Sequence, residues 1–89
     1  MPRESLEIVN EKGLHARASA KFVDVVERHD AAATVARDGL EAAGDSIMGL
    51  LMLAASRGST IEVETTGAQA DALMDALRAL VADRFGEGM

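Results

Sequence analysis

The chain has no cysteine, tryptophan or tyrosine, and its 89 residues include only two phenylalanines and two histidines. Without cysteine there is no disulfide, no thiolate metal site and no cysteine nucleophile. Two histidines are too few for a histidine-rich metal site, and no loop has the ligand pattern of a calcium or magnesium site. The sequence therefore predicts neither a metal nor a cofactor, and aliphatic residues have to fill the core.

Positive charge is also scarce, because nine Lys and Arg residues stand against fifteen Asp and Glu, for a net charge of −6. With no basic run and no Trp or Tyr for base stacking, nucleic acid is not an expected partner. Residues 1–5 lack the apolar segment of a signal peptide. The longest apolar run, residues 47–55, is too short to cross a bilayer. We expect a soluble, monomeric, cytoplasmic protein with a single domain over residues 1–89.

The spacing of apolar residues predicts the element order βαββαβα. An economical packing for this order is a short sheet with all the helices on one face, and a ferredoxin-like topology is an alternative. Residues 86–89 are expected to be a frayed end. The predicted strands begin near Leu6 and Ile8 and continue with 32–37, 40–43 and 59–65; the predicted helices cover 16–29, 46–55 and 70–81.

The segment 13–23, Gly-Leu-His-Ala-Arg-Ala-Ser-Ala-Lys-Phe-Val, places His15 at the start of a predicted helix. A helix start presents unpaired N–H groups and a partial positive charge, which together favour an anion. His15 can therefore carry a phosphoryl group, with the N–H groups of Ala16, Arg17 and Ala18 pointing towards it. The guanidinium of Arg17 suits phosphate oxygens. A lone histidine near a helix start is more often structural, but this run is more specific than a lone histidine.

The segment 46–55 has one polar side chain in ten residues, Ser46. A helix that is apolar all round needs cover on every side, and a two-layer domain of this size leaves its outer face uncovered. We expect an exposed patch that binds partners, since methionine adapts to several surfaces. The alternative is a core helix shielded by the C-terminal helix. The residues expected in the patch are Ile47, Met48, Leu51 and Met52.

The His15 segment, together with the segment that begins at Ser46, resembles the HPr family, the histidine phosphocarriers of the bacterial phosphotransferase system. The resemblance implies an α+β open-faced two-layer sandwich with an antiparallel sheet in the order 1-4-2-3 and three helices on one face. It implies that His15 accepts the phosphoryl group, that Arg17 stabilises it, and that Arg17, Ala20 and the apolar patch contact the partners. Those partners are phosphorylated enzyme I as donor and EIIA-type proteins as acceptors. The protein is then a carrier that turns over nothing by itself, and not an enzyme.

Three features refine the resemblance: Ser46, Ala18 and the segment from Leu50 to Gln69. Ser46 matches the serine that a dedicated HPr kinase phosphorylates in many members, although serine is also a good helix N-cap without any regulation. Ala18 stands where the family usually has proline, a change that preserves the helix.

The segment from Leu50 to Gln69 resembles the nitrogen-branch paralogue of HPr, which passes phosphate to regulatory proteins. We lean towards a regulatory branch, with sugar uptake still open. Two alternatives are a regulator that binds targets according to its phosphorylation state without onward transfer, and a plain interaction module in which His15 is incidental.

Overall fold

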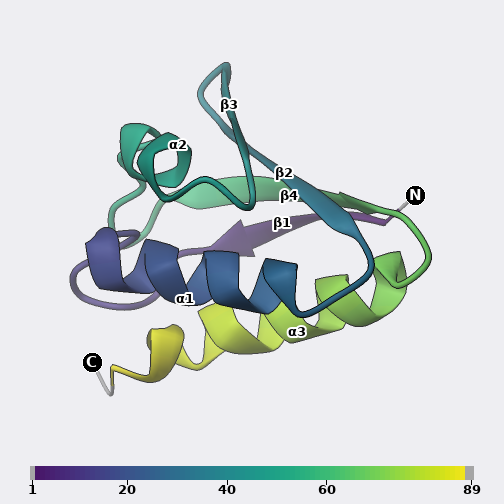
Figure 1. Cartoon of the computed structure of the whole chain (residues 1–89). Helices are drawn as coiled ribbons and strands as arrows, with labels where there is room; N and C mark the ends of the chain where they lie inside the picture. The colour runs from purple at the N-terminus through teal and green to yellow at the C-terminus, as the bar shows by residue number, and fades with distance from the viewer. Residues whose placement is uncertain (1, 88–89) are drawn as a thin grey trace.

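The computed structural model describes residues 2–87, which form a four-stranded antiparallel sheet and a layer of three helices (Figure 1). The sheet order β1-β4-β2-β3 confirms the predicted topology. No helix in residues 2–87 is long and apolar enough to cross a membrane. The strands are β1 (Arg3–Glu7), β2 (Ala32–Arg37), β3 (Leu40–Ala43) and β4 (Thr60–Thr66). The helices are α1 (Ala16–Glu27), α2 (Ile47–Met52) and α3 (Ala70–Ala82), followed by a 3₁₀ turn, η1 (Arg84–Gly86).

The register of the strands explains why one face of the sheet is covered and the other is open. Leu6 pairs with Ile61, and Val63 pairs with Val35, so that buried side chains lie opposite one another across the sheet. Side chains alternate between the two faces of a strand, and the residues between these positions, such as Glu62, are exposed. The helices cover only the apolar face.

The core lies between that face and the helices. Phe22 from α1, Leu50 from α2 and Leu77 from α3 are all fully buried. The chain's two phenylalanines, Phe22 and Phe85, are both in this core. Aliphatic side chains supply nearly all of the rest, as the scarcity of aromatic residues required.

The boundaries of five elements differ from the predicted ones. The first strand is Arg3–Glu7 and does not include Ile8, and the third helix ends at Ala82 rather than at residue 81. The first helix ends at Glu27 rather than His29, because the N–H groups of Arg28 and His29 bond to carbonyls three residues earlier and tighten the last turn. The second ends at Met52 rather than at Ala55, since Ala54 adopts a left-handed φ of +52°. The fourth strand is shifted by one residue, to Thr60–Thr66.

The prediction of a frayed end over residues 86–89 is wrong for Gly86 and Glu87, while residues 88 and 89 lie outside the described residues. After α3 the chain turns back through Arg84 and Phe85, which both have left-handed backbones, with φ of +55° and +53°. Such a conformation costs a residue other than glycine on the order of 1–3 kcal/mol. The full burial of the Phe85 side chain offsets this cost and fixes the path of the residues that follow.

Helix α2 has one buried face and one exposed face, and this gives a stability prediction. Leu50→Ala removes a fully buried side chain and should lower the free energy of unfolding by about 2–5 kcal/mol. Met48→Ala, on the exposed face of the same helix, should change it by less than about 0.5 kcal/mol. Urea denaturation of both variants measures the difference, and equal losses would show that the helix is core on both faces.

Candidate functional site

His15 is the N-cap residue of α1. Its backbone is extended, with φ −79° and ψ −176°, and its Nδ1 accepts a hydrogen bond from the N–H of Arg17 at 3.2 Å. Its carbonyl accepts from the N–H of Ser19 at 2.8 Å, the first bond of the helix. Serine, threonine, aspartate and asparagine usually fill this capping role. Because Nδ1 accepts, it carries no proton in this arrangement and its lone pair faces the helix N-terminus.

The loop before His15 is held against the segment that follows α2. The N–H of Leu14 donates to the carbonyl of Ala55 at 2.8 Å, and the Leu14 side chain is buried. Gly13 has a left-handed φ of +68°, and a Cβ there would lie 2.5 Å from the Ala55 carbonyl oxygen. Only glycine fits this close approach, so the early end of α2 and the position of the histidine are linked.

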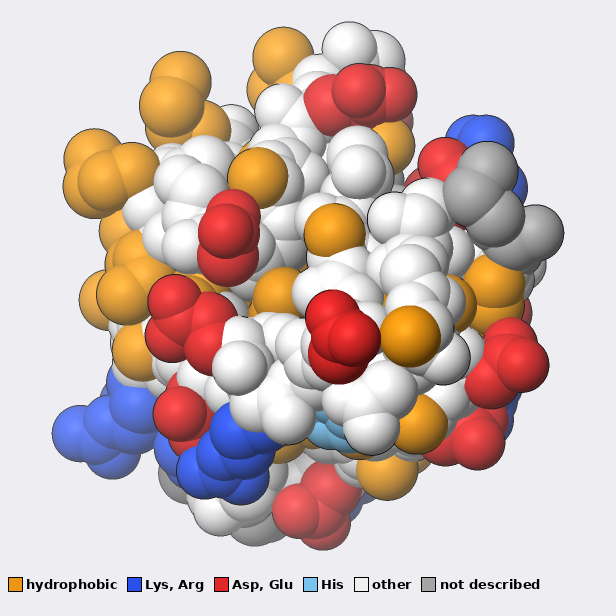
Figure 2. Space-filling view, turned by 45° about the vertical axis from the view of Figure 1, so that its right-hand side comes forward, with side chains coloured by type: hydrophobic (Ala, Val, Ile, Leu, Met, Phe, Trp, Pro, Cys, Tyr) orange, Lys and Arg blue, Asp and Glu red, His pale blue; other side chains and the backbone are white. Residues whose placement is uncertain are grey.

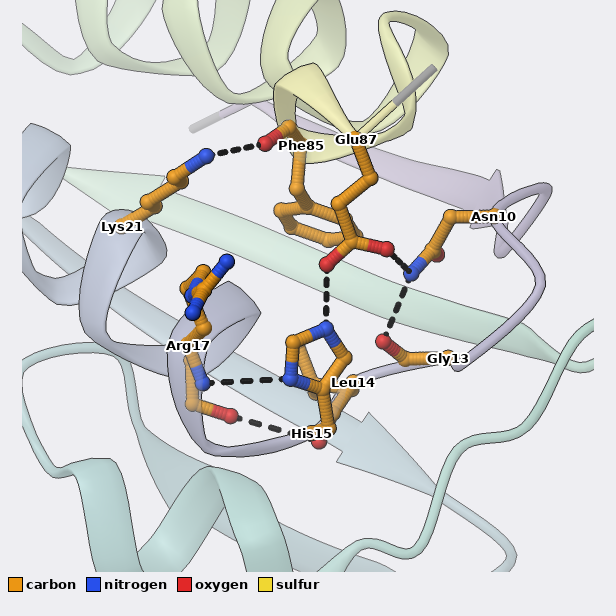
Figure 3. A network of polar contacts seen from close by, with 9 residues as sticks. Asn10, Gly13, Leu14, His15, Arg17, Lys21, Phe85 and Glu87 are labelled. Atoms are coloured by element: carbon orange, nitrogen blue, oxygen red, sulfur yellow. Dashed lines mark hydrogen bonds and ion pairs between the residues drawn. The ribbon is translucent and has the colours of Figure 1, made fainter. Parts of the chain in front are cut away.

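Two residues that the sequence analysis missed hold the other side of the imidazole (Figure 3). Nε2 of His15 contacts Oε2 of Glu87, and Oε1 of Glu87 accepts from Nδ2 of Asn10 at 3.0 Å. The same Asn10 nitrogen donates to the carbonyl of Gly13 at 2.8 Å. Since Nδ1 accepts, Nε2 is the ring nitrogen that bears the hydrogen. Nothing in the local sequence pattern linked Glu87 to a histidine 72 positions away.

The Glu87 carboxylate is largely buried, with 15% of its side chain exposed. Its pKa lies below the usual range, chiefly because Asn10 donates a hydrogen bond to the charged form. Contacts with His15 and the charge of Lys12 act in the same direction, whereas burial opposes them. The carboxylate is therefore ionised at neutral pH and accepts from both neighbours.

His15 faces a hollow of about 390 Å³ whose lining includes several positively charged side chains. Arg17 is exposed on its rim and makes no ion pair with any residue in the described range 2–87, so its guanidinium is available to an anion. Lys21 reaches the C-terminal turn, where Nζ donates to the Phe85 carbonyl at 2.6 Å. The hollow is lined by Glu11, Lys12, His15, Arg17, Lys21, Gly86 and Glu87.

The first turn of α1 only partly matches the expected set of free N–H donors. The N–H of Arg17 already bonds to His15 itself, which the sequence did not indicate. Ala16 and Ala18 lie in the same turn, where N–H groups have no partner within the helix. They stay predicted donors to a phosphoryl group.

The predicted apolar patch lies beside the start of α1 (Figure 1). Met48 and Met52 are 69% and 73% exposed, and Ile47 is 40% exposed. Leu51 is half-buried and so contributes less than expected, whereas Ala20 on α1 is exposed. Figure 2 shows hydrophobic side chains along the upper left edge, on the side where Figure 1 places α2. Leu40, at the turn between β2 and β3, is also exposed, at 54%, but it is not one of the residues of the predicted patch.

Ser46 is the N-cap of α2, as its residue type predicted. Its Oγ accepts from the N–H of Gly49 at 3.0 Å. This contact accounts for the serine without any modification, and phosphorylation of Ser46 stays a prediction.

Comparison with known proteins decides the family. The family model described as the PTS HPr component phosphorylation site matches residues 2–83. The chain belongs to the HPr family. It is 48% identical to the phosphocarrier protein HPr of Cupriavidus necator over 91% of each chain, and 46% identical to HPr of Neisseria meningitidis over 99% of each. It is also 41% identical to the phosphocarrier protein NPr of Shewanella violacea, over 90% of this chain and 88% of the relative.

Solved HPr structures have the same fold. The HPr-C-His structure from Thermoanaerobacter tengcongensis has a TM-score of 0.94 at 31% identity, with both chains fully covered. HPr from Bacillus anthracis has a TM-score of 0.85 at 34% identity, over 90% of this chain and 95% of the other. The fold expected from the resemblance, an open-faced sandwich in the order 1-4-2-3, is confirmed. Because relatives named HPr and NPr both match, similarity leaves the branch open.

The close approach at Gly13 gives a second prediction. Gly13→Ala should destabilise the fold by more than about 1 kcal/mol, because a Cβ would meet the Ala55 carbonyl oxygen and the backbone at Ser56. The matched control is Gly58→Ala, which also has a positive φ but no atom within 4 Å of the added Cβ. Denaturation curves give both changes, and equal losses would assign the effect to φ alone and not to the contact with Ala55.

Proposed function

We propose that the protein carries a phosphoryl group on Nδ1 of His15, which it accepts from phosphorylated enzyme I and passes to EIIA-type acceptors. The observation that carries this proposal is the placement of an unprotonated Nδ1 at the N-terminus of α1, in a hollow shared with Arg17, whose guanidinium forms no ion pair within residues 2–87. Membership of the phosphocarrier family supports it independently.

The transfer can be written with one bond formed and one broken. The Nδ1 lone pair attacks the phosphorus of the donor's phosphohistidine in line with the bond that breaks. A new N–P bond forms, and the electron pair of the old one returns to the donor's ring nitrogen. The proton on Nε2 stays in place, and transfer to the acceptor reverses the same steps. Such reactions depend mostly on positioning and on charge stabilisation, which this site provides.

Once Nδ1 bonds to phosphorus, its lone pair no longer accepts from Arg17. The Arg17 N–H, with those of Ala16 and Ala18, is then free to donate to the phosphoryl oxygens. The Arg17 guanidinium adds a charge-assisted hydrogen bond, a type of contact worth about 1.5–3 kcal/mol. The helix N-terminus thus donates a hydrogen bond to the histidine before transfer and donates to the phosphoryl oxygens after it.

The proposed docking surface joins Arg17 and Ala20 of α1 to Ile47, Met48, Leu51 and Met52 of α2. Its exposed methionines fit a carrier that has to bind a donor and several acceptors in turn. Sugar uptake and a regulatory nitrogen branch would use the same chemistry on His15, so that the acceptor defines the branch. A regulatory role, an HPr kinase acting on Ser46, a cytoplasmic location and a monomeric state stay predictions.

Labelling tests the proposal directly. Incubation with phosphoenolpyruvate and enzyme I from the source organism should place one phosphoryl group on His15. The label should be lost in acid and survive base, as phosphoimidazoles do. His15→Ala should remain folded and take no label, and a chase with purified EIIA-type proteins should show onward transfer. A label on His29, or one stable in acid, would contradict the assignment, and a label that never leaves would favour the regulator without transfer.

The docking surface gives a separate prediction. Met48→Lys should raise the KM of enzyme I for this protein by about 10-fold or more, because it removes an exposed apolar contact worth about 1–2 kcal/mol. Its melting temperature should stay near that of the parent. The matched control is Leu40→Lys, an exposed apolar residue on the hairpin rather than on α2. Unchanged KM for Met48→Lys would remove α2 from the interface.

A further inference from the structure

We propose that Glu87 is the positioning residue of the phosphoryl-transfer site: its carboxylate holds the proton of His15 on Nε2 and thereby leaves Nδ1 free as the nucleophile. This inference rests on the proposed function and assigns a role in it to the C-terminal segment.

The carboxylate lies between two donors. One oxygen faces Nε2 of His15, and the other accepts from Nδ2 of Asn10 at 3.0 Å (Figure 3). An ionised carboxylate only accepts, so that the nitrogen facing it has to bear a hydrogen. On the opposite side of the ring, the backbone N–H of Arg17 can only donate, so Nδ1 has to accept through its lone pair. The two contacts select the same tautomer, and together they fix the plane of the ring.

The side-chain amide of Asn10 is held in the orientation in which its Nδ2 faces Glu87. It is fully buried, and its Nδ2 donates to both the Gly13 carbonyl and the carboxylate. Its Oδ1 is buried without a hydrogen-bond partner among residues 2–87. Turning the amide over would place Oδ1 against two acceptors, so the donor has to face Glu87. A buried carbonyl oxygen left unpaired is unfavourable, which marks this orientation as one that the surrounding structure enforces.

The backbone after α3 is bent in order to bring Glu87 to the histidine. Arg84, Phe85 and Gly86 all have left-handed φ values, between +53° and +75°. Lys21 of α1 stabilises the turn by donating a hydrogen bond to the Phe85 carbonyl, and the Phe85 side chain anchors the turn in the core. Strained backbone of this kind persists where the rest of the structure holds it, and here it delivers one carboxylate to one ring nitrogen.

The same carboxylate also acts on the phosphorylated state. When phosphorus bonds to Nδ1 while Nε2 keeps its proton, the ring gains positive charge. Glu87 faces that N–H and balances the charge as it develops, while Arg17 and the helix N-terminus balance the phosphoryl oxygens on the other side. A carboxylate that orients a histidine and stabilises its positive form without taking its proton has this role in the Ser-His-Asp triad.

The test compares two variants that remove the same charge from the same hollow. Glu87→Gln keeps the shape of the side chain, but whichever way its amide is turned, a donor faces a donor at either His15 or Asn10. Glu11→Gln is the matched control, because Glu11 lines the hollow and is exposed, with no hydrogen bond to His15. Melting curves confirm that both proteins are folded.

The first readout is nitrogen-15 NMR of the His15 ring in the free protein at a pH where the imidazole is neutral. In the parent and in Glu11→Gln we expect a protonated Nε2 with an observable, downfield Hε2 resonance and an unprotonated Nδ1. In Glu87→Gln the Hε2 resonance should move upfield or vanish through exchange with water. A proton on Nδ1 in the parent, or an Hε2 resonance that is unchanged in Glu87→Gln, overturns the proposal.

The second readout is phosphoryl transfer from enzyme I. Loss of the carboxylate or carbonyl that orients a metal-bound histidine costs about 10–100-fold, and by the same physical reasoning Glu87→Gln should show a fall in kcat of about this size with little change in KM. Glu11→Gln should keep the parent's kcat. An equal fall in both variants assigns the effect to net charge and overturns the proposal. Failure of the parent itself to accept a phosphoryl group would instead refute the proposed function, and the NMR result would stand apart from it.

Discussion

The hydrogen bond from the Arg17 N–H to Nδ1 of His15 is the contact on which the site depends. It begins helix α1, because His15 fills the cap position. It also aims a ring nitrogen at the end of the helix where backbone donors are unpaired. Formation of the helix therefore also places the ring nitrogen, and the partial positive charge at the helix N-terminus is the one that receives the phosphoryl group in the proposed reaction.

Three segments far apart in the chain hold that contact in place. The loop from Asn10 to Leu14 rests on the carbonyl of Ala55, and Glu87 closes the opposite side of the ring. Each segment departs from regular structure within two residues of its contact point: Gly13, Ala54 and Phe85 all have left-handed backbones. Cooperative packing of the core offsets these local costs, so the geometry of the site depends on the stability of the whole domain.

Helix α2 shows how a small domain can leave apolar surface exposed. Leu50 and Leu53 anchor it in the core, and Ser46 caps its start. This leaves Met48 and Met52 in solvent, on the side of the molecule where α1 begins. Exposed methionines contribute little to stability, and a surface of this kind is typical of sites where partners bind. In the proposed function, one docking event on this patch presents the ring to a partner's active site.

The sequence by itself determined the element order, the capping serine, the histidine at the start of a helix and the apolar stripe of α3. These features depend on residues within one or two turns of each other, where periodicity and backbone chemistry act directly. The strand order came from the resemblance to a family, since βαββαβα allows a ferredoxin-like alternative. Tertiary structure alone decided where α2 ends and how the chain turns after α3. It also decided that Glu87 meets both His15 and Asn10, because these contacts join residues up to 77 positions apart and depend on core packing that no local pattern encodes.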